Sequence, residues 1–198
     1  MSNFWNERYR EEGFAYGDEP NVFFAEQIDK LSAGTIILPC EGEGRNAVFA
    51  ASKGWEVNAF DTSVAGKSKA LQLAYRQNVR LSYTIEDAVK AAFPNNTADV
   101  VAFIYAHFPE SIRKQIHRKA IGWLKPGGRI VLEVFNPLQL QNTSGGPKDV
   151  TMLYTKEMLL DDFAELEIEL LETLQIELQE GKYHDGKADV IRFVGVRK

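Results

Sequence analysis

The chain has 198 residues, enough for one domain of ordinary size, and its 44% hydrophobic and 26% charged residues are typical of a soluble globular protein. No apolar run approaches the ~20 residues that a membrane helix needs, and the N-terminus lacks the apolar core of a signal peptide, so we expect a cytoplasmic protein. One cysteine and three histidines are too few for an internal disulfide or a zinc site, and a net charge of -5 argues against nucleic acid as the main partner.

Short apolar runs alternate with helical patterns along the first two thirds of the chain. This order predicts an α/β fold with a mostly parallel sheet and helices on both faces. The expected strands are 35–39, 55–60, 79–85, 99–105 and 129–135. The expected helices are 45–53, one that begins after Thr62 or Ser63, and one that begins at Pro109.

The apolar positions within these elements predict how each one packs. Run 99–105 is apolar throughout, as in a buried central strand, whereas 79–85 alternates with polar residues, as in a strand near a sheet edge. Residues 125–128, KPGG, are expected to form a turn. The expected apolar positions of the helix after Ser63 are Val64, Leu71, Ala74 and Tyr75. Those of the helix after Pro109 are Ile112, Ile116, Ala120 and Trp123.

The C-terminal third permits two interpretations. Segment 164–181 is rich in Glu and Leu, which favour a helix, yet its apolar residues recur at period two between Ile168 and Leu178. A turn signal at 184–186 and alternation over 188–197 favour a long hairpin, with a helix at 164–178 as the alternative. Before the hairpin lies a long polar loop, 140–149, in a place where functional residues often occur.

The loop after the first expected strand carries a nucleotide-binding fingerprint. Gly42-x-Gly44-x-x-Ala47 lies between a strand and a helix, and Asp61 ends the next strand, 19 positions after Gly42. This is the opening of a Rossmann-like domain, in which the acid binds a ribose. The alternative for Asp61 is a turn residue or a helix cap.

Two carboxylates in this loop bear on the choice of cofactor. Glu41 and Glu43 would repel the pyrophosphate of a dinucleotide, at a cost on the order of 1 kcal/mol or more per close pair at intermediate dielectric. S-adenosylmethionine has no phosphate, and its ammonium and sulfonium would be attracted by the same charges. Its carboxylate can use backbone N–H groups at the start of helix 45–53. The loop therefore favours S-adenosylmethionine over NAD(P).

Several segments resemble one enzyme family. They are FWNERYREEGFAYGDEPN at the start, GEGRNAVFAA, NAFDTS, IED at 85–87, HFPE at 107–110, LKPGGRIVLEVF and TSGGPKD. In this order they resemble class I S-adenosylmethionine-dependent methyltransferases, specifically the tellurite-resistance and thiopurine methyltransferase branch, over nearly the whole chain. The usual family loop reads D-x-G-x-G-x-G, whereas Leu38 and Cys40 stand here at its first acid and first glycine. Glu41, three residues later, is the candidate replacement for that acid.

The resemblance implies a Rossmann-like, doubly wound sheet of seven strands, mostly parallel with an antiparallel C-terminal strand, and helices on both faces. It also implies that the glycine loop holds the methionine part of the cofactor. The residues concerned are Gly42, Gly44 and the backbone from Glu41 to Asn46.

The same resemblance assigns the nucleoside to the ends of the next strands. Asp61 would bind both ribose hydroxyls, with Thr62 under the adenine. Asp87 would bind the adenine amino group, with Ala88 beside it, and the alternative for Asp87 is a solvated helix start. The end of strand 99–105, from Tyr105 through Ala106 to His107, would border the sulfonium.

The N-terminal segment pairs Trp5, Tyr9 and Tyr16 with Arg8. By resemblance, residues 1–30 form a helical cover over cofactor and acceptor, with Tyr16 near the acceptor, and 31–198 form the Rossmann-like core of one domain, 1–198. Aromatic faces suit a sulfonium, because a cation gains from a π-face. The alternative is a helix that packs its aromatic stripe on the domain.

Methyl transfer requires the acceptor, methyl and sulfur to lie in line and water to be excluded. A neutral acceptor would need a base, and His107 is the best placed candidate. An anionic acceptor, such as a thiolate or an oxyanion of tellurium or selenium, would need none, and Lys148 would then hold its charge. The alternatives are a structural or capping role for His107 and a solvated loop position for Lys148. His117 and His184 are assigned no role.

Two other functions stay open. An NAD(P)-dependent oxidoreductase would use the same glycines, but it is disfavoured by the loop carboxylates and by the short chain without a substrate domain. A non-catalytic domain would bind S-adenosylmethionine or its product, S-adenosylhomocysteine, as a regulator. Short loops and no basic face favour a small-molecule acceptor, and a domain of this size can act as a monomer or weak homodimer.

Overall fold

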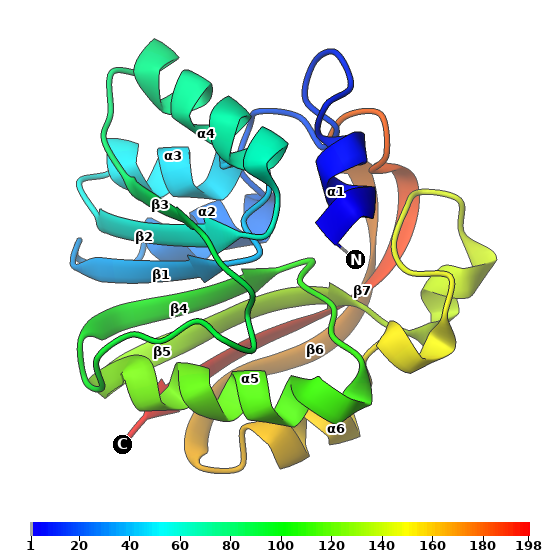
Figure 1. Cartoon of the computed structure of the whole chain (residues 1–198). Coiled ribbons are helices and arrows are strands. Elements are labelled where there is room, and N and C mark those ends of the chain that lie inside the picture. Colours follow the sequence, from blue (N-terminus) through cyan, green and yellow to red (C-terminus); the bar gives the residue numbers. More distant parts are fainter. Residues whose placement is uncertain (1) are drawn as a thin grey trace.

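The computed structural model describes residues 2–198 and contains one seven-stranded sheet with helices on both faces (Figure 1). The strands are β1 (Thr35–Pro39), β2 (Glu56–Asp61), β3 (Ser82–Ile85), β4 (Ala98–Ile104), β5 (Leu124–Phe135), β6 (Leu166–Gln179) and β7 (Asp185–Arg197). The helices are α1 (Ser2–Arg8), α2 (Val22–Ile28), α3 (Arg45–Ser52), α4 (Val64–Arg76), α5 (Glu110–Trp123) and α6 (Lys156–Asp162), with 3₁₀ helices η1 (Pro137–Gln141) and η2 (Val150–Met152). Over residues 2–198, no helix is both long and apolar enough to span a membrane.

The strand order is β3-β2-β1-β4-β5-β7-β6. Strands β1 to β5 run parallel, and β7 is antiparallel to both β5 and β6. This confirms the predicted doubly wound, mostly parallel sheet with an antiparallel C-terminal strand. The order reverses between β1 and β4, so the loops that follow these two strands diverge and leave the crevice in which such sheets bind ligands.

Helices α2, α3 and α4 cover one face of the sheet, and α5 and α6 cover the other (Figure 1). The central strand β4 is buried on both faces, as its continuous apolar run predicted. Val100 and Ala102 join the core beneath α2 and α3, whereas Val101 and Phe103 join the core beneath α5. The edge position of β3 is likewise confirmed.

The prediction of which residues form the buried face of α4 is largely wrong. Val64 and Tyr75 are 64% and 87% exposed, and Leu71 is also exposed. Of the expected positions only Ala74 is buried, and the other buried residues of this helix are Gly66, Ala70 and Leu73. Small residues are needed here because α4 lies close to the glycine loop: a Cβ atom on Gly44 would stand 2.4 Å from the Cβ of Ala70.

Two further segments differ in detail from the expectation. Strand β5 already begins at Leu124, and its register with β4 shifts between Ala98 and Val100, so residues 125–128 lie in an irregular part of a strand. Strands β6 and β7 pair from Leu166 to Gln179, which confirms the hairpin, so the helical alternative for 164–178 is wrong.

Candidate active site

The glycine loop follows β1 and begins α3. Cys40, Gly42 and Gly44 have φ angles of 56°, 60° and 85°, so three alternate residues lie in the left-handed region that favours glycine. Cys40 therefore keeps a glycine-like backbone although it carries a side chain. Gly44 is the N-cap of α3, and a Cβ atom on Gly42 would stand 2.6 Å from the hydroxyl of Tyr9.

The carboxylate of Glu41 accepts hydrogen bonds from the start of α3, directly after its own loop. Its Oε1 accepts a hydrogen bond from the Ala47 N–H at 2.7 Å, near the start of α3, and its Oε2 lies 3.5 Å from Asn46 Nδ2. These donors are backbone and amide groups rather than cations. Burial raises the pKa of Glu41 to about 7, against the lowering effect of the Ala47 N–H. Glu41 is thus a half-buried acid whose ionised form would be stabilised by a nearby cation.

Glu43 points away from the loop, toward the N-terminal segment. It is buried, and its carboxylate accepts from the Ala15 N–H at 2.7 Å and pairs with Lys69 Nζ at 2.7 Å. Lys69 also donates to the carbonyls of Glu11 and Gly13. Glu43 therefore fastens the N-terminal segment to α4, and its charge is balanced inside the protein.

Asp61 stands at the end of β2 beside the glycine loop. Its Oδ2 accepts from the Gly42 N–H at 3.1 Å and its Oδ1 from the Ser63 N–H at 2.8 Å. Burial raises the pKa of Asp61, and these backbone donors oppose that effect. The carboxylate is thus held at the edge between β1 and β2, with half-buried Thr62 following it.

Asp87 and Ala88 follow β3, the next strand of the sheet. The β2–β3 register pairs Asp61 with Ile85, so Asp87 lies at the same edge of the sheet as Asp61. Asp87 is exposed, and its Oδ1 accepts from the Val89 N–H at 2.8 Å. Its second oxygen is free of hydrogen bonds to residues 2–198, and Ala88 beside it is half-buried.

The N-terminal segment covers the glycine loop. Helix α1 lies beside α4 (Figure 1), and Asn6 Oδ1 accepts from the Ala65 N–H at 3.0 Å at the start of α4. The buried ring of Tyr9 stacks on Trp5 at 5.6 Å and packs against Gly42. The aromatic stripe therefore packs on the domain at the place where the cofactor was predicted to bind.

His107 follows β4 and the buried Ala106. Its Nδ1 lies 2.7 Å from the Met152 carbonyl, and the Phe135 N–H donates to its Nε2 at 3.2 Å. These partners require the tautomer with hydrogen on Nδ1, and both nitrogens are then engaged by the backbone. Burial lowers the pKa of His107 to about 4. The arrangement favours the structural alternative for His107 over the role of a base.

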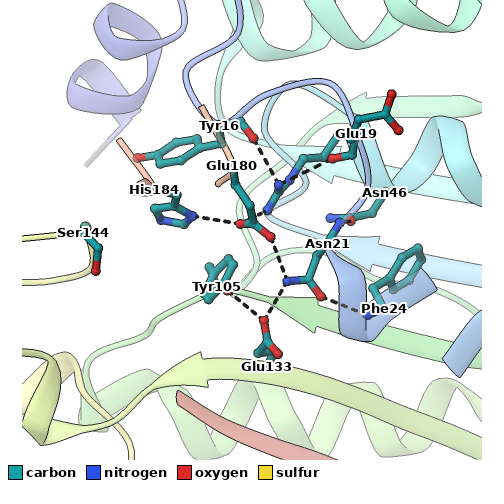
Figure 2. A network of polar contacts seen from close by, with 12 residues as sticks. Tyr16, Glu19, Asn21, Phe24, Asn46, Tyr105, Glu133, Ser144, Glu180 and His184 are labelled. Carbon is teal, nitrogen blue, oxygen red and sulfur yellow. Dashed lines mark hydrogen bonds and ion pairs between the residues drawn. The ribbon is translucent and has the colours of Figure 1, made fainter. Parts of the chain in front are cut away.

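Tyr105 directly follows β4 and belongs to a polar network that the sequence did not suggest. It has a φ of 53°, its ring stacks on Phe135 at 4.7 Å, and its hydroxyl donates to Glu133 Oε1 at 2.7 Å (Figure 2). Glu133 is fully buried and also accepts from Asn21 at 2.7 Å and from Arg192 at 2.6 Å. A charged residue within the apolar run of β5 was the available signal for this network.

Glu180, at the end of β6, forms the second half of the network. Its carboxylate pairs with Arg45 at 2.8 Å, accepts from Asn21 at 3.2 Å, and lies 3.2 Å from Nδ1 of His184 (Figure 2). The His184 ring lies between those of Tyr105 and Tyr16, at centroid distances of 4.6 and 4.4 Å. The hairpin thus brings His184 to the end of β4.

The two predicted acceptor residues lie in different surroundings. Tyr16 is half-buried within this cluster, and its hydroxyl accepts from Arg8 at 3.0 Å. Lys148 is exposed, and its ammonium donates to the Asn142 carbonyl of its own loop at 3.3 Å. The structure places Tyr16 beside His184, and it leaves Lys148 on the surface of loop 140–149.

The residues present fit a nucleoside that carries a cation. Left-handed Gly42 and Gly44 allow close approach to the loop, Asp61 presents a fixed carboxylate at the end of β2, and Glu41 is a half-buried acid without a cationic partner in direct contact. A pyrophosphate would meet the carboxylate of Glu41, and the nearby guanidinium of Arg45 is already paired with Glu180.

Comparisons with known proteins agree with this geometry. Residues 38–128 match the family model described as a methyltransferase domain. A comparison with curated proteins gave no match.

Similar solved structures share the fold across most of the chain. A protein studied for the conversion of a disulfide bond into a thioacetal group during echinomycin biosynthesis has a TM-score of 0.80 at 16% identity, covering 100% of this chain and 92% of that one. TehB from Haemophilus influenzae has a TM-score of 0.74 at 13% identity, covering 100% of this chain and 67% of that one. A putative methyltransferase from Bacillus halodurans has a TM-score of 0.70 at 14% identity, covering 87% and 96%. Residues 38–128 are therefore similar in sequence to a methyltransferase domain, and the whole chain has the fold of the similar solved structures.

Proposed function

We propose that the protein transfers the methyl group of S-adenosylmethionine to a small-molecule acceptor by in-line displacement, as an enzyme of the tellurite-resistance and thiopurine methyltransferase branch. The observation that carries the proposal is the pair of acids held at one edge of the sheet: Glu41 in the glycine loop, and Asp61 tied to the Gly42 N–H. A cation-bearing nucleoside satisfies both acids, with its ammonium at Glu41 and its ribose hydroxyls at Asp61, whereas the pyrophosphate of a dinucleotide would be repelled by Glu41.

In this proposal the chain holds the cofactor through the ends of three strands. Glu41 attracts the ammonium, and Gly42 and Gly44 let the methionine part approach the backbone. Asp61 accepts from the ribose hydroxyls, and Thr62 supports the adenine. Asp87, with Ala88 beside it, offers its free oxygen to the adenine amino group. When bound, the cofactor supplies a methyl group already activated by a positively charged sulfur.

Other residues act by positioning and by excluding water. Glu43 and Lys69 hold the N-terminal segment over the loop, so Tyr9 and Trp5 shield the site. Asn46 accepts from the Asn21 N–H at 2.9 Å and so links the glycine loop to the polar network. Tyr16 faces the acceptor, and exposed Lys148 is available to an anionic acceptor only if loop 140–149 closes. A monomer or weak homodimer in the cytoplasm suits this role.

The cofactor is tested by calorimetric titration with S-adenosylmethionine, S-adenosylhomocysteine and NADH. We expect micromolar binding of the first two, lost in Asp61→Ala, retained in a control variant with exposed Glu165 changed to Gln, and no binding of NADH. Binding of NADH without binding of either S-adenosyl compound would favour the NAD(P)-dependent oxidoreductase instead.

The acceptor class is tested by mass spectrometry of S-adenosylhomocysteine release with one thiol, one phenol, one amine, selenite and tellurite. Turnover with selenite, tellurite or the thiol supports the proposed branch. Tight cofactor binding without turnover on any probe would favour the regulatory alternative.

A further inference from the structure

We propose that His184, oriented by Glu180, takes the proton of a neutral methyl acceptor in this active site. The inference rests on the proposed function and concerns the part of it that the sequence left open, namely which residue acts as the base. Sequence reasoning pointed to His107 and assigned His184 no role, because His184 lies in a turn far from the glycine loop along the chain.

The hydrogen bonds of His184 leave one nitrogen available. Its Nδ1 lies 3.2 Å from Glu180 Oε2, and an ionised carboxylate only accepts, so the hydrogen of the neutral ring is on Nδ1. Its Nε2 then carries a lone pair and has no hydrogen-bond partner among residues 2–198. This nitrogen is also not sealed in the core, whereas Nε2 of His117 is buried without a partner. An imidazole held at Nδ1 by a carboxylate and free at Nε2 is the arrangement of a general base.

The position of Glu180 is itself fixed. Arg45, at the start of α3, donates to Oε2 of Glu180 at 2.8 Å, and Asn21 donates to Oε1 at 3.2 Å. Arg45 directly follows the glycine loop, and the Asn21 backbone N–H donates to Asn46 near the start of α3. The orientation of His184 is therefore coupled to the cofactor side of the site.

Aromatic rings and a loop glycine surround the imidazole of His184, beside Tyr16, the residue predicted to lie near the acceptor. Its ring lies 4.4 Å from that of Tyr16 and 4.6 Å from that of Tyr105, at the end of β4 (Figure 2). On the other side lies loop 140–149, where a Cβ atom on Gly145 would stand 3.2 Å from Nε2. Because Gly145 has no side chain, the loop packs closely against this edge of the imidazole, and His184 is 5% exposed. His107, by contrast, has no free nitrogen.

The proposed methyl and proton transfers need no reactant besides the acceptor, the cofactor and His184. The lone pair of the acceptor forms the bond to the methyl carbon, the carbon–sulfur bond breaks with its electron pair on sulfur, and the acceptor proton moves to Nε2. The carboxylate of Glu180 stabilises the resulting imidazolium, whereas the positive charges of Arg45 and Arg8 destabilise it. The other titratable groups that face the ring are Tyr16, Tyr105 and His107. Burial lowers the pKa of His184, so the ring is neutral and able to accept a proton at neutral pH.

The geometry is tested without turnover by ¹⁵N nuclear magnetic resonance of the histidine rings, with the His184 signals assigned from the spectrum of His184→Gln. We expect hydrogen on Nδ1 and none on Nε2 at neutral pH. Glu180→Ala should give a mixture of tautomers, and Glu177→Ala, which removes an exposed carboxylate from the same strand, should give the wild-type spectrum. Hydrogen on Nε2 in the wild type would overturn the proposal.

The chemistry is tested with the acceptor probes. With the neutral phenol or thiol, His184→Gln should lower kcat by roughly 10²-fold or more while the affinity for S-adenosylhomocysteine is kept, and with selenite it should change little. Equal turnover of the neutral probe by wild type and variant would also overturn the assignment of His184. If no probe is methylated, the proposed function fails, and the resonance experiment still decides the geometry of His184.

Discussion

Replacing Glu41 with Gln isolates the cost of keeping a charge in the glycine loop. Burial raises the pKa of Glu41 from its ordinary value of 4.5 to about 7. Because the folded-state pKa is the higher one, the stabilising contribution of the protonated form is complete below pH 4.5 and is lost as pH rises through about 7. At ~1.4 kcal/mol per pKa unit, the loss amounts to at most about 3.5 kcal/mol above that pH.

We therefore expect Glu41→Gln to be more stable than the wild type above about pH 7.5, by an amount that disappears near pH 4.5. A Gln amide oxygen can still accept from the Ala47 N–H, so the cap of α3 is kept. Urea unfolding at a series of pH values measures the difference. Glu165→Gln, which removes an exposed carboxylate, should show no such dependence on pH. A stability difference between wild type and Glu41→Gln that stays constant over this range would refute the reasoning.

The same substitution should have the opposite effect on the cofactor. An ionised Glu41 attracts the ammonium of S-adenosylmethionine, so Glu41→Gln is expected to weaken binding about tenfold, equivalent to ~1.4 kcal/mol. Calorimetry should also show that wild-type affinity increases as pH rises through about 7, and that this increase is absent in the variant. An unchanged affinity in Glu41→Gln would mean that the carboxylate serves only as a helix cap.

Three further substitutions test the backbone of the glycine loop and a buried ion pair between α5 and α6. Gly44→Ala places a Cβ atom 2.4 Å from Ala70 at a φ of 85° and should cost ~2–4 kcal/mol in thermal unfolding, with partial recovery when Ala70→Gly is added. At Cys40, with a φ of 56°, Val should be less stable than Gly by about 1–2 kcal/mol, and equal stabilities would contradict the left-handed backbone. Asp162→Ala leaves Arg113 buried without its 2.7 Å partner and should cost ~3–5 kcal/mol in urea unfolding, a loss that an exposed pair would not show.

The fold could be predicted largely from local patterns, because a parallel sheet buries its strands on both faces and so leaves continuous apolar runs. Run 99–105 became the central strand, and the period-two pattern from Ile168 to Leu178 outweighed the helix propensity of its Glu and Leu residues. The failure at α4 has a physical cause. This helix approaches the glycine loop so closely that small residues form its buried face, and hydrophobicity alone does not report a distance between backbones.

The residues of the candidate site also differ in how well the sequence predicted them. Gly42 and Asp61 are related by a short strand–loop–helix–strand unit, so their spacing in sequence predicted that both belong to one site, and the structure joins them by a hydrogen bond of 3.1 Å. The partners of Glu43 and His107, in contrast, come from distant segments: Ala15 and Lys69 for the former, Met152 and Phe135 for the latter. Which side chain points into a site depends on such partners, and a single sequence does not contain them.

The two acids of the glycine loop thus have different roles. Glu43 is neutralised by Lys69 and belongs to the attachment of the N-terminal segment, so it says nothing about the ligand. Glu41 is different, because its ionised form is disfavoured by burial and a Gln would cap α3 equally well at less cost. A protein that keeps a carboxylate at such a position gives up stability for it, as functional sites commonly do. That cost is offset when a cation binds beside Glu41, and a positively charged nucleoside is the ligand that this loop can hold.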